Sequence, residues 1–352
     1  MAGYNGGYNG GYNGGYNGGY NGGYNGGYNG GYAGTARGSE IASTTAIAMT
    51  RDALADPSDL KLYAAPKNPA LNPSTDSDLD TVKSRLSRWN PWVQVQIALQ
   101  EVLSGVNIAC EANAVRISYP GFSDGVILAP SEGQFEKELS EVFAAAQLRE
   151  ERSSEVLTQI HEQWNFWSAL LPLPLDQARS TQVLLDVVYY LSTYLGMRLK
   201  HNFGAYRPSQ RSPQVQPMIA VPQHGAYPMG HATQAYAVAR VLEWLTSGHA
   251  PSAWPATFHP ANAASLADPG STALVVNFYK LAHRIGYNRI VAGVHYPVDL
   301  EAGRWLGMYL ADLVMSRASG PSTQFPHAKS STILRSIHDQ AVSEWSFLKQ
   351  VA

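Results

Sequence analysis

The sequence contains only one cysteine, Cys110, in 352 residues. A single cysteine cannot form an intrachain disulfide, and we expect its thiol to be a small buried side chain. Because cysteine-poor chains survive in oxidising and reducing compartments alike, this count leaves the redox compartment open. No stretch reaches the roughly 18 uncharged apolar residues that a membrane span requires, so the sequence predicts no transmembrane segment.

An excess of charge of one sign is also missing. Lysine and arginine total 25 and aspartate and glutamate total 27, which gives a formal net charge of -2. This balance predicts no field that would collect nucleic acid or an anionic membrane, so any anion must be bound locally. The first residues show no basic stretch followed by an apolar one, which leaves the location open between the cytoplasm and export by a non-standard route.

Residues 4–32 repeat Tyr-Asn-Gly-Gly and contain no aliphatic residue that could form a core. In an extended strand, tyrosine and asparagine would lie on opposite faces, so stacked copies would form ladders of each. Two interpretations of this arm, residues 1–35, stay open. It is a solvated tail, or it pairs between chains and builds a homo-oligomer or a filament.

The rest of the chain is predicted to be an all-α bundle with a small β-hairpin insertion, and 45% hydrophobic residues can fill its core. Prolines interrupt residues 36–90, an arm with one short helix near Glu40 to Leu54. Residues 91–320 form the helical domain, and alternation predicts the hairpin at about 107–128. Residues 321–352 are a tail with a last helix. Within the domain, helices are expected over Trp92–Leu103, Phe135–Leu148, Ser153–Leu170, Asp176–Asn202, His231–Ser247, Thr272–Gly286 and Pro297–Arg317.

The first of three motifs pairs Lys200 with Arg207 across six residues and places Pro208 directly after the arginine. A helix that ends near Lys200 and a turn at the proline would let the two cations converge on one anion. The arginine offers a planar fork for two oxygens, and the lysine offers a point charge for a third.

In the second motif, Gly230 and His231 stand at the start of a predicted helix. Helix N-termini bind anions because their first N–H groups have no partner and the dipole is positive there. Glycine lets the backbone approach an oxyanion closely, and the histidine can supply a proton.

The third motif sets Arg289 six residues before His295 and Asp299 four residues after it. A helix that begins at Pro297 puts the aspartate in its first turn. From there the carboxylate can reach one nitrogen of His295 and fix the tautomer, which leaves the other nitrogen free as a nucleophile or a ligand.

In their order and spacing, the three motifs resemble the signature of the superfamily that unites type-2 phosphatidic-acid phosphatases (PAP2), bacterial acid phosphatases and vanadium haloperoxidases. The resemblance covers about Leu170 to Leu313. It implies that Lys200, Arg207 and Arg289 bind oxygens of an oxyanion and that His231 is the general acid. It also implies that His295, oriented by Asp299, attacks phosphorus or coordinates vanadium.

Two positions depart from the signature, because Met229 and Asn288 stand where relatives have serine. A thioether cannot donate the hydrogen bond that a hydroxyl gives to a bound oxyanion, so Met229 predicts a weakened site. A zinc site built from His201, His224, His231 and His295 competes poorly, since neither cysteine pairs nor an H-E-x-x-H helix accompanies these histidines.

Three functions follow from these observations. The leading one is hydrolysis of a small phosphate monoester through a phosphohistidine at His295, which needs no cofactor. The second is a vanadium-dependent haloperoxidase, with vanadate on the same residues and His295 as the only metal ligand. The third is a structural subunit, weakened at Met229, that keeps the fold while the repeat assembles a filament.

Overall fold

The computed structural model describes residues 79–160, 163–171, 178–248, 250–261, 272–323 and 325–351. The Tyr-Asn-Gly-Gly repeat and the short helix expected near Glu40 to Leu54 lie outside these residues. The chain divides into two compact units, one with residues 1–78 and Arg88–Val93 and the other with Leu79–Ser87 and Gln94–Ala352. The second unit contains all residues of the predicted site.

Helices make up most of the described chain, as predicted. Their bounds are α3 Leu79–Leu86, α4 Pro91–Gly105, α5 Glu132–Ala145, α6 Arg149–Thr158, α7 Trp164–Ser168, α8 Arg179–Phe203, α9 Pro208–Arg211, α10 Gly230–Ser247, α11 Ala273–Val291, α12 Pro297–Ser319 and α13 Thr332–Val351. Two short 3-10 helices cover Ala146–Leu148 and Pro213–Val215. None of the helices in the described ranges is both long and apolar enough to cross a membrane.

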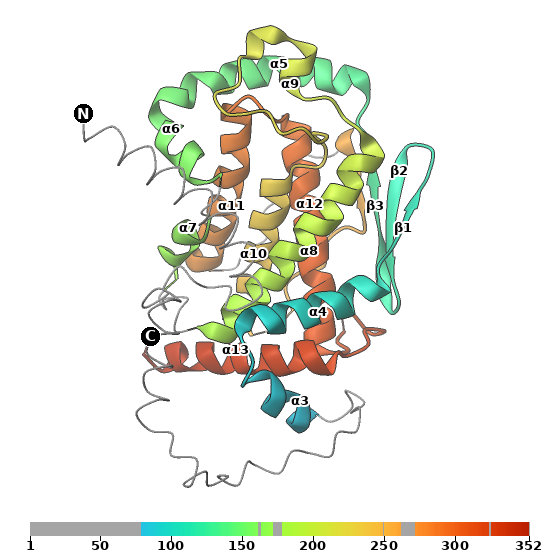
Figure 1. Cartoon of the computed structure of the whole chain (residues 1–352), viewed down its shortest axis with the longest axis vertical. Coiled ribbons are helices and arrows are strands. Elements are labelled where there is room, and N and C mark those ends of the chain that lie inside the picture. Colours follow the sequence, from blue (N-terminus) through green and yellow to red (C-terminus); the bar gives the residue numbers. More distant parts are fainter. Residues whose placement is uncertain are drawn as a thin grey trace, which may run out of the picture. The chain divides into compact units, whose positions relative to one another are not determined.

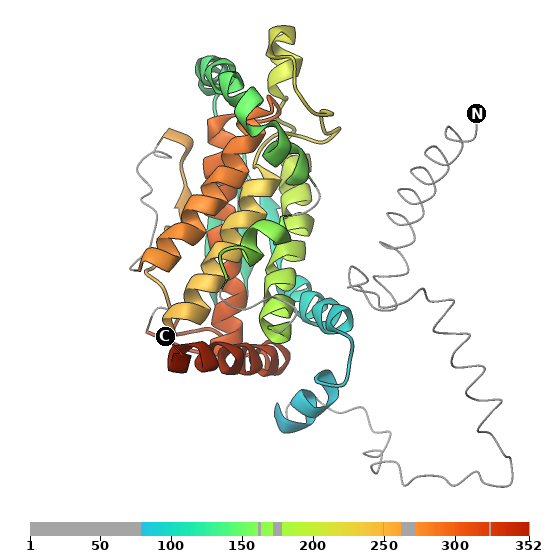
Figure 2. The ribbon, with the colours of Figure 1, turned by 90° about the vertical axis from the view of Figure 1, so that its left-hand side faces the viewer.

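Helix α10 is the centre of the bundle. It packs against α8, α11 and α12, and nearly all of its side chains are buried. Figures 1 and 2 show these four helices side by side, with α13 lying across one end of the bundle. The other end, near α5 and α6, gathers the C-termini of α8 and α11 and the N-termini of α10 and α12.

Two predicted helices were wrong in their bounds. The run expected over Ser153–Leu170 is broken, since α6 ends at Thr158 and α7 begins only at Trp164. A continuous helical period in the sequence therefore concealed a break between two helices. Helix α11 is longer than expected, because Gly286 lies inside it rather than at its end. This extension carries Arg289 on the last turn of a helix instead of in a loop.

The predicted hairpin is part of a larger sheet. Strands β1 (Asn107–Cys110), β2 (Ala114–Tyr119) and β3 (Phe122–Leu128) form an antiparallel meander, and β4 (Thr257–Phe258) adds to β3 in parallel. The pairing of β4 was not visible in the sequence because a two-residue strand has no period. The expectation that Cys110 is buried was wrong, because it ends the edge strand β1 and is exposed.

Two glycines of α12 let it approach α10 closely. A methyl group added at Gly303 would lie 2.5 Å from the carbonyl oxygen of Met229, and one at Gly307 would overlap the carbonyl oxygen of Thr233. A main-chain hydrogen bond of 2.8 Å from Met229 to the carbonyl oxygen of Asp299 joins the starts of the two helices. These contacts place the second and third motifs next to each other.

We predict that Gly307→Ala lowers the free energy of unfolding by about 3 kcal/mol, because backbone rather than a flexible side chain blocks the new methyl group. Gly196→Ala on α8 is the matched control, since a methyl group there meets no atom within 4 Å. Alanine is the better helix former by about 1 kcal/mol, so the control should gain stability. Urea unfolding measures both. Equal stabilities for the two variants would contradict the close approach of α10 and α12.

Candidate oxyanion site

The site is built where four helices of the bundle end or begin. Lys200 lies in the last turn of α8, and Arg207 directly precedes α9. His231 lies in the first turn of α10, Arg289 lies in the last turn of α11, and Asp299 lies in the first turn of α12, just after His295. Residues from all three motifs thus come to one end of the bundle (Figure 1).

Asp299 holds the ring of His295. Its Oδ2 atom lies 2.9 Å from Nδ1 of His295 and also accepts a 2.9 Å hydrogen bond from the main-chain N–H of Tyr296. Because a carboxylate accepts, Nδ1 carries the proton and Nε2 carries a lone pair. That lone pair faces Nη1 of Arg207 at 2.8 Å. The geometry is that of a neutral histidine with one nitrogen ready to act as a ligand or a nucleophile.

Arg207 and Lys200 are anchored to main-chain carbonyl groups. Besides His295, the guanidinium of Arg207 donates to the carbonyl oxygens of Val294, at 2.7 Å, and of His224 and Gly225. Lys200 donates to the carbonyl oxygens of Gly225, at 3.1 Å, and Ala226, at 2.9 Å. The segment between α9 and α10 thus fixes the direction of both cations.

Arg289 is buried and keeps donors to spare. Its Nη2 atom donates to the carbonyl oxygen of Val156, at 2.8 Å, and to Oε1 of Gln159, at 3.3 Å. Its Nε and Nη1 atoms are buried and have no hydrogen-bond partner among the described residues. Unpaired donors on a buried cation are costly, which points to a ligand as their partner.

Positive charge dominates the site. Burial is the main reason why the pKa of Lys200 falls to about 7 and the pKa values of Arg207 and Arg289 fall to about 10. Burial raises the pKa of Asp299 to about 7, although the neighbouring cations oppose that shift. Two arginines and a lysine whose pKa is lowered thus lie near a single acidic side chain in a water-poor space, and an anion among them would favour their charged forms.

The two histidines respond to the same field. Burial lowers the pKa of His295 well below its ordinary value, and Arg207, Lys200 and His231 lower it further. Burial and the charge of Arg289 lower the pKa of His231 to about 3. Both rings are therefore neutral at physiological pH until an anion adds negative charge beside them.

Gly230 and the two residues that stand in place of the signature serines, Met229 and Asn288, make different contacts. Gly230 lies beside Lys200, since a methyl group on it would sit 3.8 Å from Cε of that lysine. Met229 is fully buried and precedes α10 without capping it by a side-chain hydrogen bond. Asn288 is buried too, and its amide donates to Oε1 of Gln159 at 2.9 Å. The second missing serine is thus replaced by a structural contact.

Several residues of the site carried no recognisable sequence signal. Val156 lies in α6 and Gln159 directly follows that helix, both outside the three motifs. Glu138 of α5 accepts a 2.8 Å hydrogen bond from the main-chain N–H of Val298 at the start of α12. Main-chain acceptors cannot be read from side-chain identity. Across the described part of the chain, no three His, Cys, Asp or Glu side chains lie close enough together to hold a metal ion. This includes the four histidines considered above as a zinc site.

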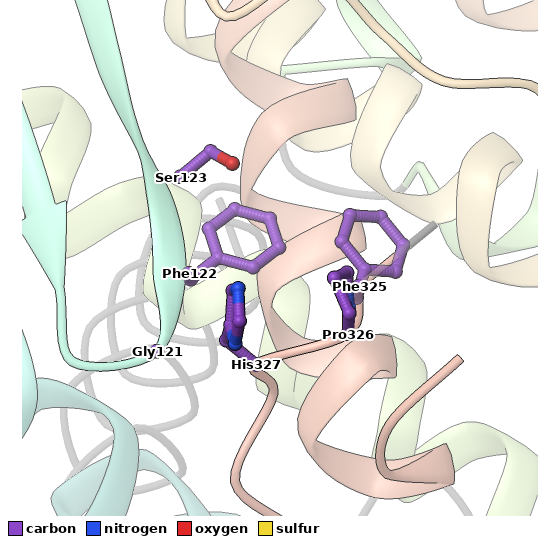
Figure 3. A pocket seen from close by; sticks show the side chains of 6 residues that line it. All are labelled: Gly121, Phe122, Ser123, Phe325, Pro326 and His327. Carbon is purple, nitrogen blue, oxygen red and sulfur yellow. The ribbon is translucent and has the colours of Figure 1, made fainter. Parts of the chain in front are cut away.

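A separate surface hollow lies between the start of β3 and the segment before α13 (Figure 3). It has a volume of about 410 Å³, and the rings of Phe122 and Phe325 stack in it at 5.3 Å between centroids. Its lining has one histidine, His327, but neither lysine nor arginine. The hollow therefore lacks the cations that a tetrahedral oxyanion requires.

Fold and site together describe a mostly helical protein that gathers buried Lys200, Arg207 and Arg289 around His295 and Asp299. Residues 198–322 match the family model of the VCPO second helical-bundle domain, the second helical bundle of vanadium haloperoxidases. The match includes Lys200, Arg207, His231, Arg289, His295 and Asp299. It supports a place for this segment in the PAP2 and haloperoxidase-like superfamily. No curated protein matches the chain.

We predict that His231→Gln flattens the dependence of the free energy of unfolding on pH between about pH 6.5 and pH 3. The folded ring stays neutral down to about pH 3, whereas a histidine in the unfolded chain takes up a proton near pH 6.5. The native chain therefore loses stability as the pH falls through this window, by up to about 1.4 kcal/mol per pH unit for this ring. Urea unfolding at successive pH values measures the slope. If the free energy of unfolding fell equally steeply with pH in both proteins below pH 6, the lowered pKa of His231 would be contradicted.

Proposed function

We propose that the site binds vanadate at Nε2 of His295 and that the protein is a vanadium-dependent haloperoxidase. The observation that carries the proposal is the match of residues 198–322, which include the site residues of all three motifs, to the VCPO second helical-bundle domain. Bound vanadate would activate hydrogen peroxide for the oxidation of a halide. A neutral imidazole whose other nitrogen is tied to a carboxylate is a good ligand for such a group.

The donors present fit an oxyanion of this kind. Nε and Nη1 of Arg289 are buried without a partner among the described residues, and Lys200 uses two of its three N–H groups. Arg207 is more fully engaged, and its Nη1 atom rests against Nε2 of His295. Binding requires that this nitrogen turn from the ring toward an oxygen of the ligand.

The chain's own residues then divide the work. Lys200, Arg207 and Arg289 balance negative charge on the oxyanion, and the low dielectric around them strengthens each contact. His231 can take up and release a proton beside the ligand, because a neighbouring anion raises its pKa from the depressed value of about 3. Asp299 keeps His295 in the tautomer that offers Nε2.

Hydrolysis of a phosphate monoester is the second candidate, favoured by the hydrogen bond from Nδ1 of His295 to Asp299. That bond makes Nε2 a nucleophile toward phosphorus as well as a ligand. His231 would protonate the leaving oxygen and later take a proton from water. The same residues serve both functions, so only the reaction distinguishes them.

We predict that His295→Ala abolishes turnover while the fold is kept. Two assays are needed, one with vanadate, bromide and peroxide and one with p-nitrophenyl phosphate. Loss of a ligand or covalent nucleophile normally costs several decades in rate, so the variant should retain less than about a tenth of either activity. Activity in the first assay alone supports the haloperoxidase, and activity in the second alone supports the phosphatase. An active His295→Ala variant would remove His295 from both mechanisms.

We predict that Met229→Ser raises vanadate affinity or phosphatase activity by about tenfold or more, because serine supplies one hydrogen bond to a charged group. Met229 is fully buried, so the shorter side chain also costs core packing, and results should be compared per folded protein. Met229→Ala is the matched control, since it leaves the same space without a hydroxyl. If the serine variant gains nothing over the alanine variant, the structural-subunit interpretation is favoured.

A further inference from the structure

The residue that links α6 to the site is Gln159, which follows the last residue of that helix and is fully buried. Its Oε1 atom accepts hydrogen bonds from Nδ2 of Asn288, at 2.9 Å, and from Nη2 of Arg289, at 3.3 Å. Its own amide nitrogen donates to Oε1 of Glu155 at 3.0 Å. The side chain is thus held at both ends, and its position is fixed rather than incidental.

The contact with Gln159 restrains Arg289 without neutralising it. Both acceptors of Nη2, the carbonyl oxygen of Val156 and the amide oxygen of Gln159, are uncharged. The nearest carboxylate on α6, that of Glu155, is itself paired with Arg284 at 2.8 Å. Within the described part of the chain only Nη2 of this guanidinium donates a hydrogen bond, so Nε and Nη1 are available to a ligand.

The main chain of the same residue orients His231. Its carbonyl oxygen lies 3.2 Å from Nε2 of that ring, and a carbonyl can only accept, so Nε2 carries the proton. In a neutral ring the lone pair is then on Nδ1. Nδ1 makes no hydrogen bond to any side chain or main-chain group in the described ranges. Proton exchange with a bound molecule must therefore take place at Nδ1.

We propose that Gln159 is a positioning residue of the oxyanion site, which holds Arg289 through one nitrogen and leaves its charge uncompensated, and holds His231 in the Nε2–H tautomer. This inference rests on the proposed oxyanion binding. It adds the residue that follows α6, which lies before the segment that matches the family model. A proton that reaches Nδ1 converts the ring to an imidazolium, whose Nε2–H stays on the carbonyl oxygen of Gln159.

The neutrality of Gln159 is the feature to test, and Gln159→Glu changes it with almost no change in shape. A carboxylate there would form an ion pair with Arg289 and compete with the oxyanion. Titration calorimetry with inorganic phosphate and, separately, with orthovanadate should show binding weakened by about tenfold or more, the equivalent of one hydrogen bond to a charged group. The loss should shrink as the pH is lowered and the new carboxylate takes up a proton, a change that a purely structural role would not produce.

Two variants serve as controls. Gln159→Leu removes all three hydrogen bonds of the side-chain amide without adding charge, so its affinity should lie between those of wild type and Gln159→Glu. Gln163→Leu removes another buried glutamine, whose side-chain amide donates to Gln234 rather than to the site, and it should bind as wild type does. Thermal unfolding of all three separates a loss of binding from a loss of fold.

The tautomer of His231 is an independent readout that needs no variant at position 159. Nitrogen NMR of the wild-type protein, with the signal assigned by its disappearance in His231→Gln, should show a proton on Nε2. A proton on Nδ1, or a Gln159→Glu protein that folds and binds both anions as tightly as wild type, would overturn the role of Gln159 and leave the proposed function standing. A wild-type protein that binds neither anion would overturn both.

Discussion

The close approach of α10 and α12 is the constraint on which the site depends. Side chains at Gly303 and Gly307 would collide with the main chain of α10, so only glycine permits this distance. At the site end of that contact, the main-chain N–H of Met229 donates to the carbonyl oxygen of Asp299. The bond ties the start of the helix that carries His231 to the start of the helix that holds His295. The residues proposed as the general acid and as the nucleophile or ligand are thereby brought to the same end of the bundle by backbone packing.

Burial explains both the properties of the site and its cost. Desolvation is the largest cause of every large pKa shift among Lys200, Arg207, His231, Arg289 and Asp299. Removing cations from water is unfavourable, and main-chain carbonyl groups offset part of that cost for Lys200 and Arg207. The cost of burying Arg289 is offset least, since two of its nitrogens have no hydrogen-bond partner in the described chain. The site is therefore held in a state that gains most from an incoming anion.

Those parts of the site that consist of side chains at a fixed spacing could be predicted from the sequence. Lys200 and Arg207 converge because a helix ends and a proline turns the chain, and Asp299 reaches His295 because a carboxylate in the first turn of α12 can contact the residues that precede the helix. The position of Arg289 needed the true end of α11, which Gly286 concealed. Gln159 could not have been found at all, because it meets the motifs only through tertiary packing over about 130 residues of chain. The pairing of β4 with β3 could not be predicted either, because a strand of two residues shows no alternating pattern.

The choice between vanadate and phosphate depends on how the protein treats Nε2 of His295. Both functions need the lone pair that Asp299 fixes there, and both meet Arg207 on the same nitrogen. A resident ligand can displace Arg207 once and then share its charge continuously. A substrate must displace the contact between Nη1 of Arg207 and Nε2 of His295 in every cycle, while Nε and Nη2 can stay held by His224 and Gly225 in the segment before α10. The anchored guanidinium is then a fixed partner for an oxygen of either group, and the match of residues 198–322 to a haloperoxidase domain is the observation behind the proposal of vanadate.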